Sequence, residues 1–368
     1  MCIRDSVLTE EQEFLKSSAK DLLKGAPVAL VRELRDKENE LGYSDDLWKA
    51  MVEMGWPSTA LSEDLGGLDF GLKGLNIIME ECGRTLSNSP LFSSLLSGLI
   101  IQKYGGQSHK TILSESVANG VPIAVAVQEG ESYNPKSNKT QLSGGVLSGE
   151  KTMVADAHVA SHLLVACSGE SGVEVALVPT DTTGVTITKG FFMDSRYYST
   201  VSFDSVAIAD DQILSAGKGK SIINYTTNCA SLLLSSELIG LMSEAFERTV
   251  EYIKERRQFD RVIGSFQGLQ HRAADLYGEI EVAKSLVLRA VDALQEEDIT
   301  ATAICSMAKA KTAKVAQVAT NEGVQMFGGI GMTDDEEIGF FLKRARVAIA
   351  LFGNYSYHLN RFAKMSGY

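Results

Sequence analysis

The chain has 368 residues, of which 44% are hydrophobic and 22% charged, and its formal net charge is −12. This length exceeds what one small hydrophobic core usually needs, so two or three subdomains are expected. The negative charge argues against nucleic acid or an anionic membrane surface as a partner, although local basic groups can still bind an anionic ligand.

The first third of the chain has a helical pattern. Thr9 is followed three residues later by Gln12, as in a capping box, and apolar residues then recur at helical spacing. Gly-Trp-Pro and Gly-Gly sequences break the pattern at residues 55–57 and 66–67. We therefore predict an N-terminal all-helical domain over residues 1–120, with further helices over 47–54, 72–84 and 90–104.

The pattern changes at Pro122 to short apolar runs separated by Gly, Ser, Asn and Asp. Several runs are rich in β-branched residues, which favours strands. Short strands with turns at this spacing predict a small β-barrel or β-sandwich over residues 121–213. The expected strands cover residues 123–127, 146–151, 161–167, 173–179, 184–188 and 198–206.

From Gly219 onward the pattern is helical again. One apolar face runs along the helix that leads to Glu255. Three more helices are expected over residues 267–294, 299–327 and 336–352. These would form a C-terminal four-helix bundle within residues 214–368, and the whole chain is then an α+β multidomain protein.

The cysteines and the hydropathy pattern indicate the cellular compartment. The chain has no Cys-x-x-Cys pair, which suits free thiols in a reducing compartment and offers no zinc or disulfide framework. No run reaches the roughly 18 apolar residues of a membrane span, and no signal peptide is recognisable. We expect a cytoplasmic protein. Met1 to Ser6 fit no pattern and need not be a native start. The five cysteines are Cys2, Cys82, Cys167, Cys229 and Cys305.

The break between the first two C-terminal helices carries a candidate anion site. Arg256 or Arg257 could bind a phosphate through parallel charge-assisted hydrogen bonds. Phe259 offers a flat apolar face to a ring, and Gln267 can both donate and accept. A solvated basic turn between two helices accounts for the same residues equally well.

A second candidate site is the segment Gln325–Met332, which holds three glycines. Glycines without a Cβ let the backbone approach a ligand closely, and their amides can meet phosphate. Gly328 and Gly329 could instead end the preceding helix as a C-cap. The segment is not a Rossmann fingerprint, because it follows a helix and lacks the Gly-x-Gly-x-x-Gly order.

Both motifs, and the order of helices, β region and helices, resemble the acyl-CoA dehydrogenase family over nearly the whole chain. Residues 61–68, residues 80–84 and the hairpin at 149–154 resemble it too. The resemblance implies FAD as cofactor, α,β-dehydrogenation of an acyl-CoA thioester, electron-transfer flavoprotein as acceptor, and a homo- or hetero-oligomer. It also implies that the adenosine diphosphate half of FAD lies across a subunit interface. Its contacts would be Arg256, Gln258, Phe259 and Gln267 from one chain, and Gln325, Gly328 and Gly329 from its neighbour.

The chain departs from the family at both ends of the expected FAD site. Family members usually have Thr or Ser in place of Gln258 and Gly in place of Asp260, and an Asp beside a diphosphate is electrostatically unfavourable. The family's Thr-Glu-x-x-x-Gly-Ser-Asp loop corresponds to residues 128–135, which lack Gly-Ser-Asp. On the flavin hairpin, Met153 replaces a frequent aromatic residue and Ala155 replaces a frequent hydroxyl.

The catalytic base is also missing. Removal of the α proton needs a desolvated carboxylate with a raised pKa. Phe352 stands at the family's usual Glu position, and Ala230 stands near its alternative position. We expect Glu237 to be structural or solvated, and His358 to be a packing or surface histidine rather than a catalyst.

These losses suggest the base-lacking subunit of the bacterial heteromeric α2β2 acyl-CoA dehydrogenases, which often act on steroid side chains and other bulky acids. Three alternatives stay open. One is an active homomer with an unrecognised base. Another is a non-catalytic structural subunit that binds no flavin. The third is a flavin monooxygenase or nitroalkane oxidase on the same fold.

Overall fold

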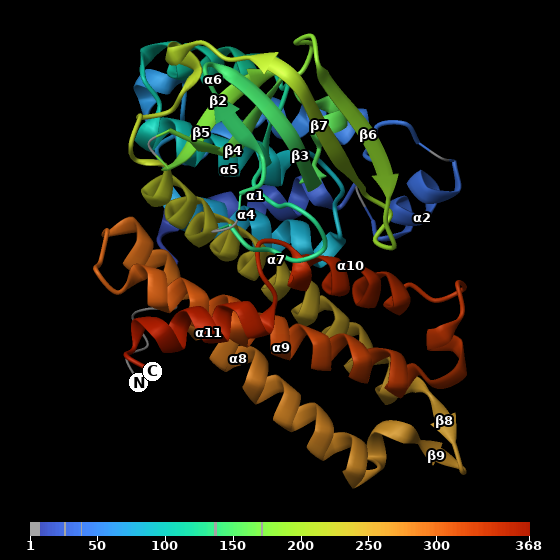
Figure 1. Cartoon of the computed structure of the whole chain (residues 1–368). Coiled ribbons are helices and arrows are strands. Elements are labelled where there is room, and N and C mark those ends of the chain that lie inside the picture. Colours follow the sequence, from blue (N-terminus) through green and yellow to red (C-terminus); the bar gives the residue numbers. More distant parts are fainter. Residues whose placement is uncertain (1–7, 26, 38, 136–137, 171) are drawn as a thin grey trace.

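The computed structural model describes residues 8–25, 27–37, 39–135, 138–170 and 172–368, so Met1 to Ser6 lie outside it. Helices come first, then a sheet, then helices again, as the sequence predicts (Figure 1). The predicted domain limits at residues 120 and 213 fall in the connections before the first strand and before the longest helix. These limits stay predictions.

The N-terminal region contains six helices among the described residues. Thr9 begins the first helix as predicted: the Gln12 amide donates to Thr9 Oγ1 at 3.3 Å, and the Thr9 amide donates to Gln12 Oε1 at 3.1 Å. The second helix is not predicted because it has only eight residues and no side-chain N-cap, and the sixth is not predicted because its two buried residues, His109 and Leu113, mark no apolar stripe. The helices are α1 (Glu10–Leu23), α2 (Ala29–Asp36), α3 (Asp45–Glu53), α4 (Gly71–Thr85), α5 (Leu91–Tyr104) and α6 (Gln107–Asn119).

The middle region is one seven-stranded mixed sheet in the order β1-β4-β2-β3-β7-β6, with β5 paired to β4. β1 and β4 run parallel, with Ile123 opposite His162. Strand periodicity divides their side chains between two cores. Ala124 and Leu163 face the sheet's own core, whereas Val125 and Leu164 join the main helical core. The strands are β1 (Ile123–Ala126), β2 (Gln141–Ser143), β3 (Val146–Ala155), β4 (His162–Gly169), β5 (Gly172–Pro179), β6 (Val185–Phe191) and β7 (Tyr197–Ala207).

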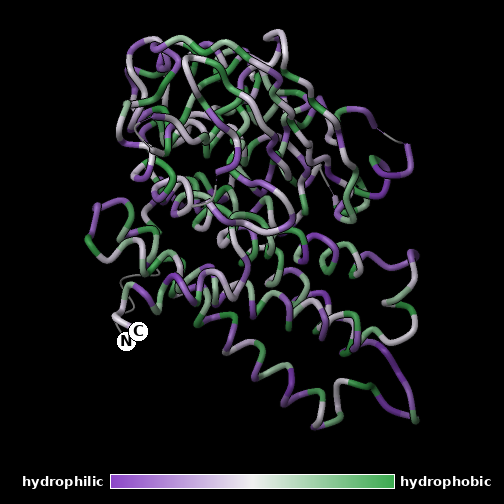
Figure 2. The backbone as a smooth tube through the Cα atoms, viewed as in Figure 1, coloured by the Kyte–Doolittle hydropathy of each residue, from purple (hydrophilic) through white to green (hydrophobic). Residues whose placement is uncertain are grey.

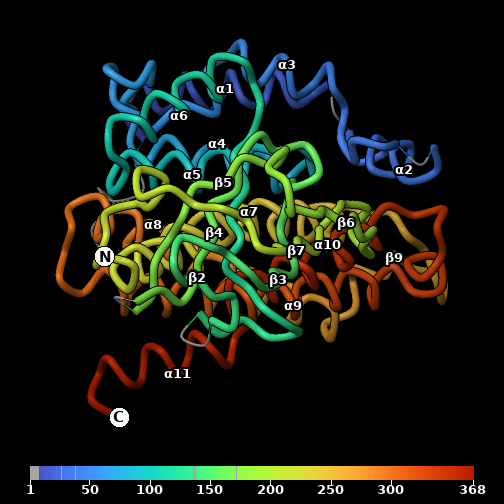
Figure 3. Tube along the Cα trace, turned by 45° about the horizontal axis from the view of Figure 1, so that its top comes forward, coloured from blue at the N-terminus to red at the C-terminus, as the bar shows by residue number. Residues whose placement is uncertain are grey.

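The C-terminal region contains the four predicted long helices and one more. α11 is not predicted, because His358 is its only buried side chain. Figure 3 shows α11 at the edge of the molecule, away from the N-terminal helices α1 and α3. The helices are α7 (Gly219–Glu255), α8 (Gln267–Gln295), α9 (Ala301–Phe327), α10 (Ile338–Ala350) and α11 (Tyr355–Met365).

α7 is the central helix, and it packs closely on α4. A Cβ at Gly83 would lie 2.0 Å from the Glu237 carbonyl oxygen, and a Cβ at Gly240 would lie 1.8 Å from the Glu80 carbonyl oxygen. Only glycine permits this approach. Within the described residues, α7 is the one helix long and apolar enough to cross a membrane, but 89% of its most apolar window is buried inside the fold. Such burial is typical of a core helix.

A buried ion cluster joins α7, α10 and the turn between β6 and β7. The Arg344 guanidinium donates to both Glu237 oxygens at 2.7 and 2.6 Å, and to Asp194 Oδ2 at 2.8 Å. Arg196 approaches Glu237 Oε1 at 3.3 Å. Burial alone would raise the pKa of Glu237, but the charges of Arg344 and Arg196 lower it to about 2. Glu237 is therefore structural, one of the two roles expected from the sequence.

Replacement of Arg344 by Leu is expected to lower the free energy of unfolding by about 3–5 kcal/mol, because it leaves Glu237 and Asp194 buried without their main cation. Urea denaturation measures the loss. Arg346→Leu is the control: this residue lies two positions along the same helix, is exposed, and should change stability by less than about 0.5 kcal/mol. Equal effects of the two substitutions would contradict a stabilising role for the cluster.

Candidate functional site

The first predicted motif forms an exposed hairpin between α7 and α8. β8 (Arg257–Gln258) pairs with β9 (Arg261–Val262), and Phe259 and Asp260 form the two-residue turn. Both turn residues have positive φ, 51° for Phe259 and 61° for Asp260, a conformation that Gly, Asn and Asp tolerate but that is strained for Phe. Phe259 is also 82% exposed, so packing among the described residues does little to offset this conformation. Figure 2 shows mainly hydrophilic residues along this turn, which projects from the helices.

The second motif lies beside the first at the same end of the helices. The Tyr252 ring stacks on Phe327 with ring centroids 4.2 Å apart, and its hydroxyl donates to the Phe327 carbonyl at 3.2 Å. A small apolar cluster of Ile253, Ile263 and Met326 joins the two segments. One end of the chain's helical region therefore carries both motifs (Figure 1).

All seven residues predicted to contact the adenosine end of FAD are exposed: Arg256, Gln258, Phe259, Gln267, Gln325, Gly328 and Gly329. Among the described residues, no carboxylate pairs with Arg256 or Arg257. Gly328 is the C-cap of α9 with φ 70°, so the structural alternative accounts for this glycine. A Cβ at Gly329 would meet nothing within 4 Å, which leaves its backbone open to a ligand. The donors suit a diphosphate.

The region predicted to hold the flavin ring is instead filled by aromatic side chains. Tyr133 lies in the loop after β1. Its side chain is buried, and its hydroxyl lies 2.7 Å from Thr227 Oγ1. Its ring lies 5.7 Å from the Phe352 ring and 5.2 Å from the Tyr357 ring. Phe352 in turn packs edge-on against Phe92 at 5.7 Å.

The gap that remains there is about 10 Å³ in volume. A cavity of this size holds about one water molecule at most, so no flavin ring fits in this gap. The residues fit the adenosine end of FAD but not its ring. The gap is lined by Val125, Val127, Gln128, Tyr133, Thr152, Met153, Leu351 and Phe352, none of which is a carboxylate.

Neither Glu237 nor His358 replaces the missing base. Ala230 is fully buried in α7, and Glu237 is held by Arg344. His358 is buried, with Nε2 3.0 Å from the Phe352 carbonyl, and burial lowers its pKa to about 3. It is a packing residue, one of the two roles expected for it.

The loop that departs from the family has a structural anchor that the sequence analysis missed. Glu129 Oε1 lies 2.6 Å from Nζ of the fully buried Lys151, and it also accepts from the Thr140 hydroxyl at 2.8 Å. The signal in the sequence was the Glu of the family's Thr-Glu pair, which is kept here. Glu129 therefore ties the loop to β3 and is not free for catalysis.

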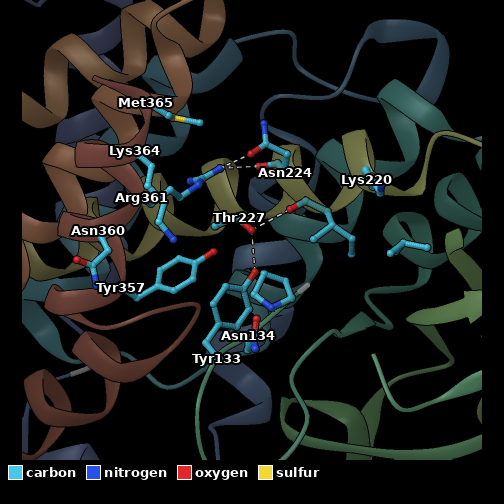
Figure 4. A pocket seen from close by; sticks show the side chains of 13 residues that line it. Tyr133, Asn134, Lys220, Asn224, Thr227, Tyr357, Asn360, Arg361, Lys364 and Met365 are labelled. Atoms are coloured by element: carbon cyan, nitrogen blue, oxygen red, sulfur yellow. Dashed lines mark hydrogen bonds between the residues drawn. The ribbon is translucent and has the colours of Figure 1, made fainter. Parts of the chain in front are cut away.

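A large cleft next to Tyr133 was also missed. It has a volume of about 1020 Å³ and lies between the Tyr133 loop, the first half of α7 and α11 (Figure 4). Its cations are Lys220, Arg361 and Lys364. Two of these come from α11, which the sequence analysis did not predict.

Two family models match the chain. The acyl-CoA dehydrogenase N-terminal domain matches residues 9–120, and the acyl-CoA dehydrogenase C-terminal domain matches residues 217–366. The acyl-CoA dehydrogenase IpdE2 of Mycolicibacterium smegmatis is 29% identical over 94% of this chain and 96% of its own length.

Solved structures match over the same extent. A variant of the Tcur3481–Tcur3483 steroid ACAD is 27% identical to this chain. The match covers 97% of this chain and 98% of the solved chain, with a TM-score of 0.89. Butyryl-CoA dehydrogenase from Megasphaera elsdenii is 22% identical. The match covers 98% of this chain and 99% of the solved chain, with a TM-score of 0.90. These likenesses confirm the expected fold: an N-terminal helical region, a middle sheet and a C-terminal helical region.

Replacement of Tyr133 tests whether its ring fills the region expected to hold the flavin ring. Tyr133→Ala is expected to lower the free energy of unfolding by about 3–5 kcal/mol, because it removes a buried ring. Tyr133→Phe keeps the ring and loses only the hydrogen bond to Thr227, so it should cost about 0.5–1.5 kcal/mol. Urea denaturation compares the two. An Ala variant as stable as the Phe variant would show that the ring does not fill this space.

Proposed function

We propose that this chain, which belongs to the acyl-CoA dehydrogenase family, is one subunit of a heteromeric acyl-CoA dehydrogenase and holds the adenosine end of an FAD whose ring lies on a partner chain. Family members are FAD-dependent oxidoreductases that act on CH–CH groups. The catalytic base would also lie on the partner.

The observation that carries the proposal is the contrast between the two ends of the FAD site. The gap next to Tyr133 and Phe352 measures about 10 Å³ and offers no carboxylate. The seven residues predicted for the adenosine end are all exposed. Arg256 and Arg257 have no carboxylate partner among the described residues. One half of a cofactor site is closed while the other half stays open.

The length of α7 separates these two halves on one chain. Thr227 contacts Tyr133, and Arg256 caps α7, so 29 helical steps of about 1.5 Å place them about 43 Å apart. An extended dinucleotide is shorter than this. The hairpin therefore suits a flavin held by another chain, as expected for a site that crosses a subunit interface.

In that arrangement, the Arg256 guanidinium and the backbone amide of Gly329 would hold the diphosphate, and Phe259 would stack on the adenine. Bound FAD supplies the hydride acceptor. Exposed apolar side chains near the hairpin and along α8 and α9 favour contact with a neighbouring chain. They are Phe259, Tyr277, Val282, Val318, Ile330 and Met332.

The relatives support a composite enzyme and a bulky substrate. The 27% identical structure is the Tcur3481–Tcur3483 steroid ACAD, whose name joins two proteins. We extend this to an α2β2 assembly acting on steroid-derived or similar acyl-CoA thioesters in the cytoplasm, with electron-transfer flavoprotein as acceptor.

A non-catalytic structural subunit is the second candidate. The closed gap and the phenylalanine at the base position favour it, because both features would be expected if the partner alone binds flavin. The exposed, strained Phe259 is the observation against it, because a purely structural subunit gains nothing from this conformation.

The visible flavin spectrum distinguishes these functions. We expect the purified chain to be colourless alone, and flavin to appear when it is co-expressed with the acyl-CoA dehydrogenase encoded by the neighbouring gene. Flavin bound by the chain alone, with acyl-CoA turnover at rates typical of the family, would overturn the proposal. No flavin in either preparation would favour the structural subunit.

Phe259→Ala is expected to leave stability unchanged within about 0.5 kcal/mol, because the side chain is 82% exposed. In the co-expressed complex it should weaken FAD binding roughly 5- to 100-fold, the effect of losing one aromatic–base stack. Flavin retained after dialysis measures this. Phe14→Ala, with a ring 77% exposed on α1, is the matched control and should change neither quantity. Equal flavin loss in both variants would argue against an adenine contact.

A further inference from the structure

We infer that Arg35, on the N-terminal helix α2, is a positioning residue for the Gln325–Met332 segment. It fixes the turn that follows the three glycines, and so it presets the backbone that would meet the diphosphate of FAD. The inference rests on the proposed function, in which this segment contacts the adenosine end of the cofactor. It adds to that function a residue that lies 299 positions before the one it binds.

The three glycines run directly into a turn, residues 333–337, that leads to α10. The Thr333 amide donates to the Ile330 carbonyl at 3.0 Å. Gly331 is buried against α9, where a Cβ would lie 2.8 Å from the Val324 carbonyl oxygen. The glycines and the turn are therefore one hydrogen-bonded unit. A shift of the turn would move the Gly329 backbone with it.

Arg35 binds this turn through two parallel hydrogen bonds. Its Nη1 and Nη2 donate to Oδ1 and Oδ2 of Asp334 at 2.8 and 2.7 Å, and its Nε donates to Asp36 Oδ1 at 2.7 Å. A bidentate pair of this kind fixes the orientation of the carboxylate as well as its distance. The hydrogen bonds from Arg35 lower the pKa of Asp334 to about 2, so the pair is fully ionised at neutral pH.

The helix that carries Arg35 is itself firmly seated. Val28 and Val31 belong to the main helical core. Phe340 is buried in the first turn of α10, and the guanidinium carbons of Arg32 and Arg35 lie 5.4 and 5.5 Å from its ring centroid. These distances allow cation–π contact. Figures 1 and 3 show α2 on the same side of the molecule as the turn that leads into α10.

The charge of the turn gives this anchor a second effect. Residues 333–337 read Thr-Asp-Asp-Glu-Glu, so four carboxylates directly follow the segment proposed to hold a diphosphate. Like charges repel, so an unrestrained acidic turn would weaken the binding of an anion. Arg35 neutralises Asp334 near one end of the turn. At the other end, Arg248 Nη1 donates to Glu337 Oε2 at 2.6 Å.

The partial exposure of the pair separates a positioning role from a purely structural one. The side chains of Arg35 and Asp334 are 25% and 53% exposed, so loss of the pair should have little effect on global stability. Its effect should instead be local, in the turn and in the glycines that precede it. We therefore expect local amide exchange and FAD affinity to change while Tm stays almost constant.

Amide hydrogen exchange of the isolated full-length chain reports on the segment without any flavin. Arg35→Ala is expected to speed exchange at residues 330–333 roughly two- to fivefold, the range for a well-oriented surface pair. Arg35→Lys keeps the charge but loses the planar fork, so its rates should be intermediate. Lys37→Ala is the matched control, because it removes an exposed cation at the end of the same helix, and it should leave these rates unchanged.

In the co-expressed complex, Arg35→Ala should weaken FAD binding roughly two- to fivefold. Asp334→Asn breaks the same pair from the side of the turn. It should speed exchange as Arg35→Ala does but weaken FAD binding less, because it also removes a negative charge near the diphosphate.

Exchange rates that match the wild type in both Arg35→Ala and Asp334→Asn would overturn the inference, and so would an equal loss of FAD in Lys37→Ala. A wild-type complex that holds no flavin would instead overturn the proposed function. In that case, the exchange rates of the isolated chain would still decide whether Arg35 positions the segment, so the two failures are distinguishable.

Discussion

The fixed position of α7 is the constraint on which the rest of the structure depends. Gly83 and Gly240 let it pack on α4 at backbone contact, and the Arg344–Glu237 pair ties it to α10. This one helix carries Thr227 and the cleft in its first half, and the exposed hairpin follows its last turn. Its rigidity keeps the cleft and the hairpin far apart on each chain, which is why the proposed composite flavin site needs a partner chain to complete it.

Sequence patterns predicted the elements that bury a continuous face and missed those that do not. The long helices, the capping box at Thr9 and six of the seven main strands were predictable because their periodicity extends over many residues. α2 has only eight residues, α6 buries only His109 and Leu113, and α11 buries only His358, so none of them carries a long apolar stripe. The consequence reaches the candidate site, because α11 supplies Arg361 and the cleft could not be foreseen without it.

The candidate site divides in the same way. The seven adenosine-end residues and the phenylalanine at the base position follow from short motifs, and the structure adds only that the former are exposed and the latter buried. The closure of the ring space was not predictable, because it depends on Tyr133 reaching Thr227, 94 residues away in the chain, to form its hydrogen bond. A single sequence shows which residues a loop contains but not where the loop lies.

Phe352 and Phe259 both have positive φ, but one is buried and the other is exposed. Phe352 has φ 53° and is buried, and its loop is held from within: Lys309 Nζ donates to the Ala348 carbonyl at 2.7 Å, and His358 contacts the Phe352 carbonyl. Phe259 has φ 51° but is 82% exposed, and the edge of the Phe266 ring lies 6.4 Å from its ring. Strain in a buried loop can be offset by its own packing, whereas strain in an exposed turn needs an external contact to offset it. The interior site has thus been closed and stabilised, and the exterior hairpin is the part of the molecule that a partner would complete.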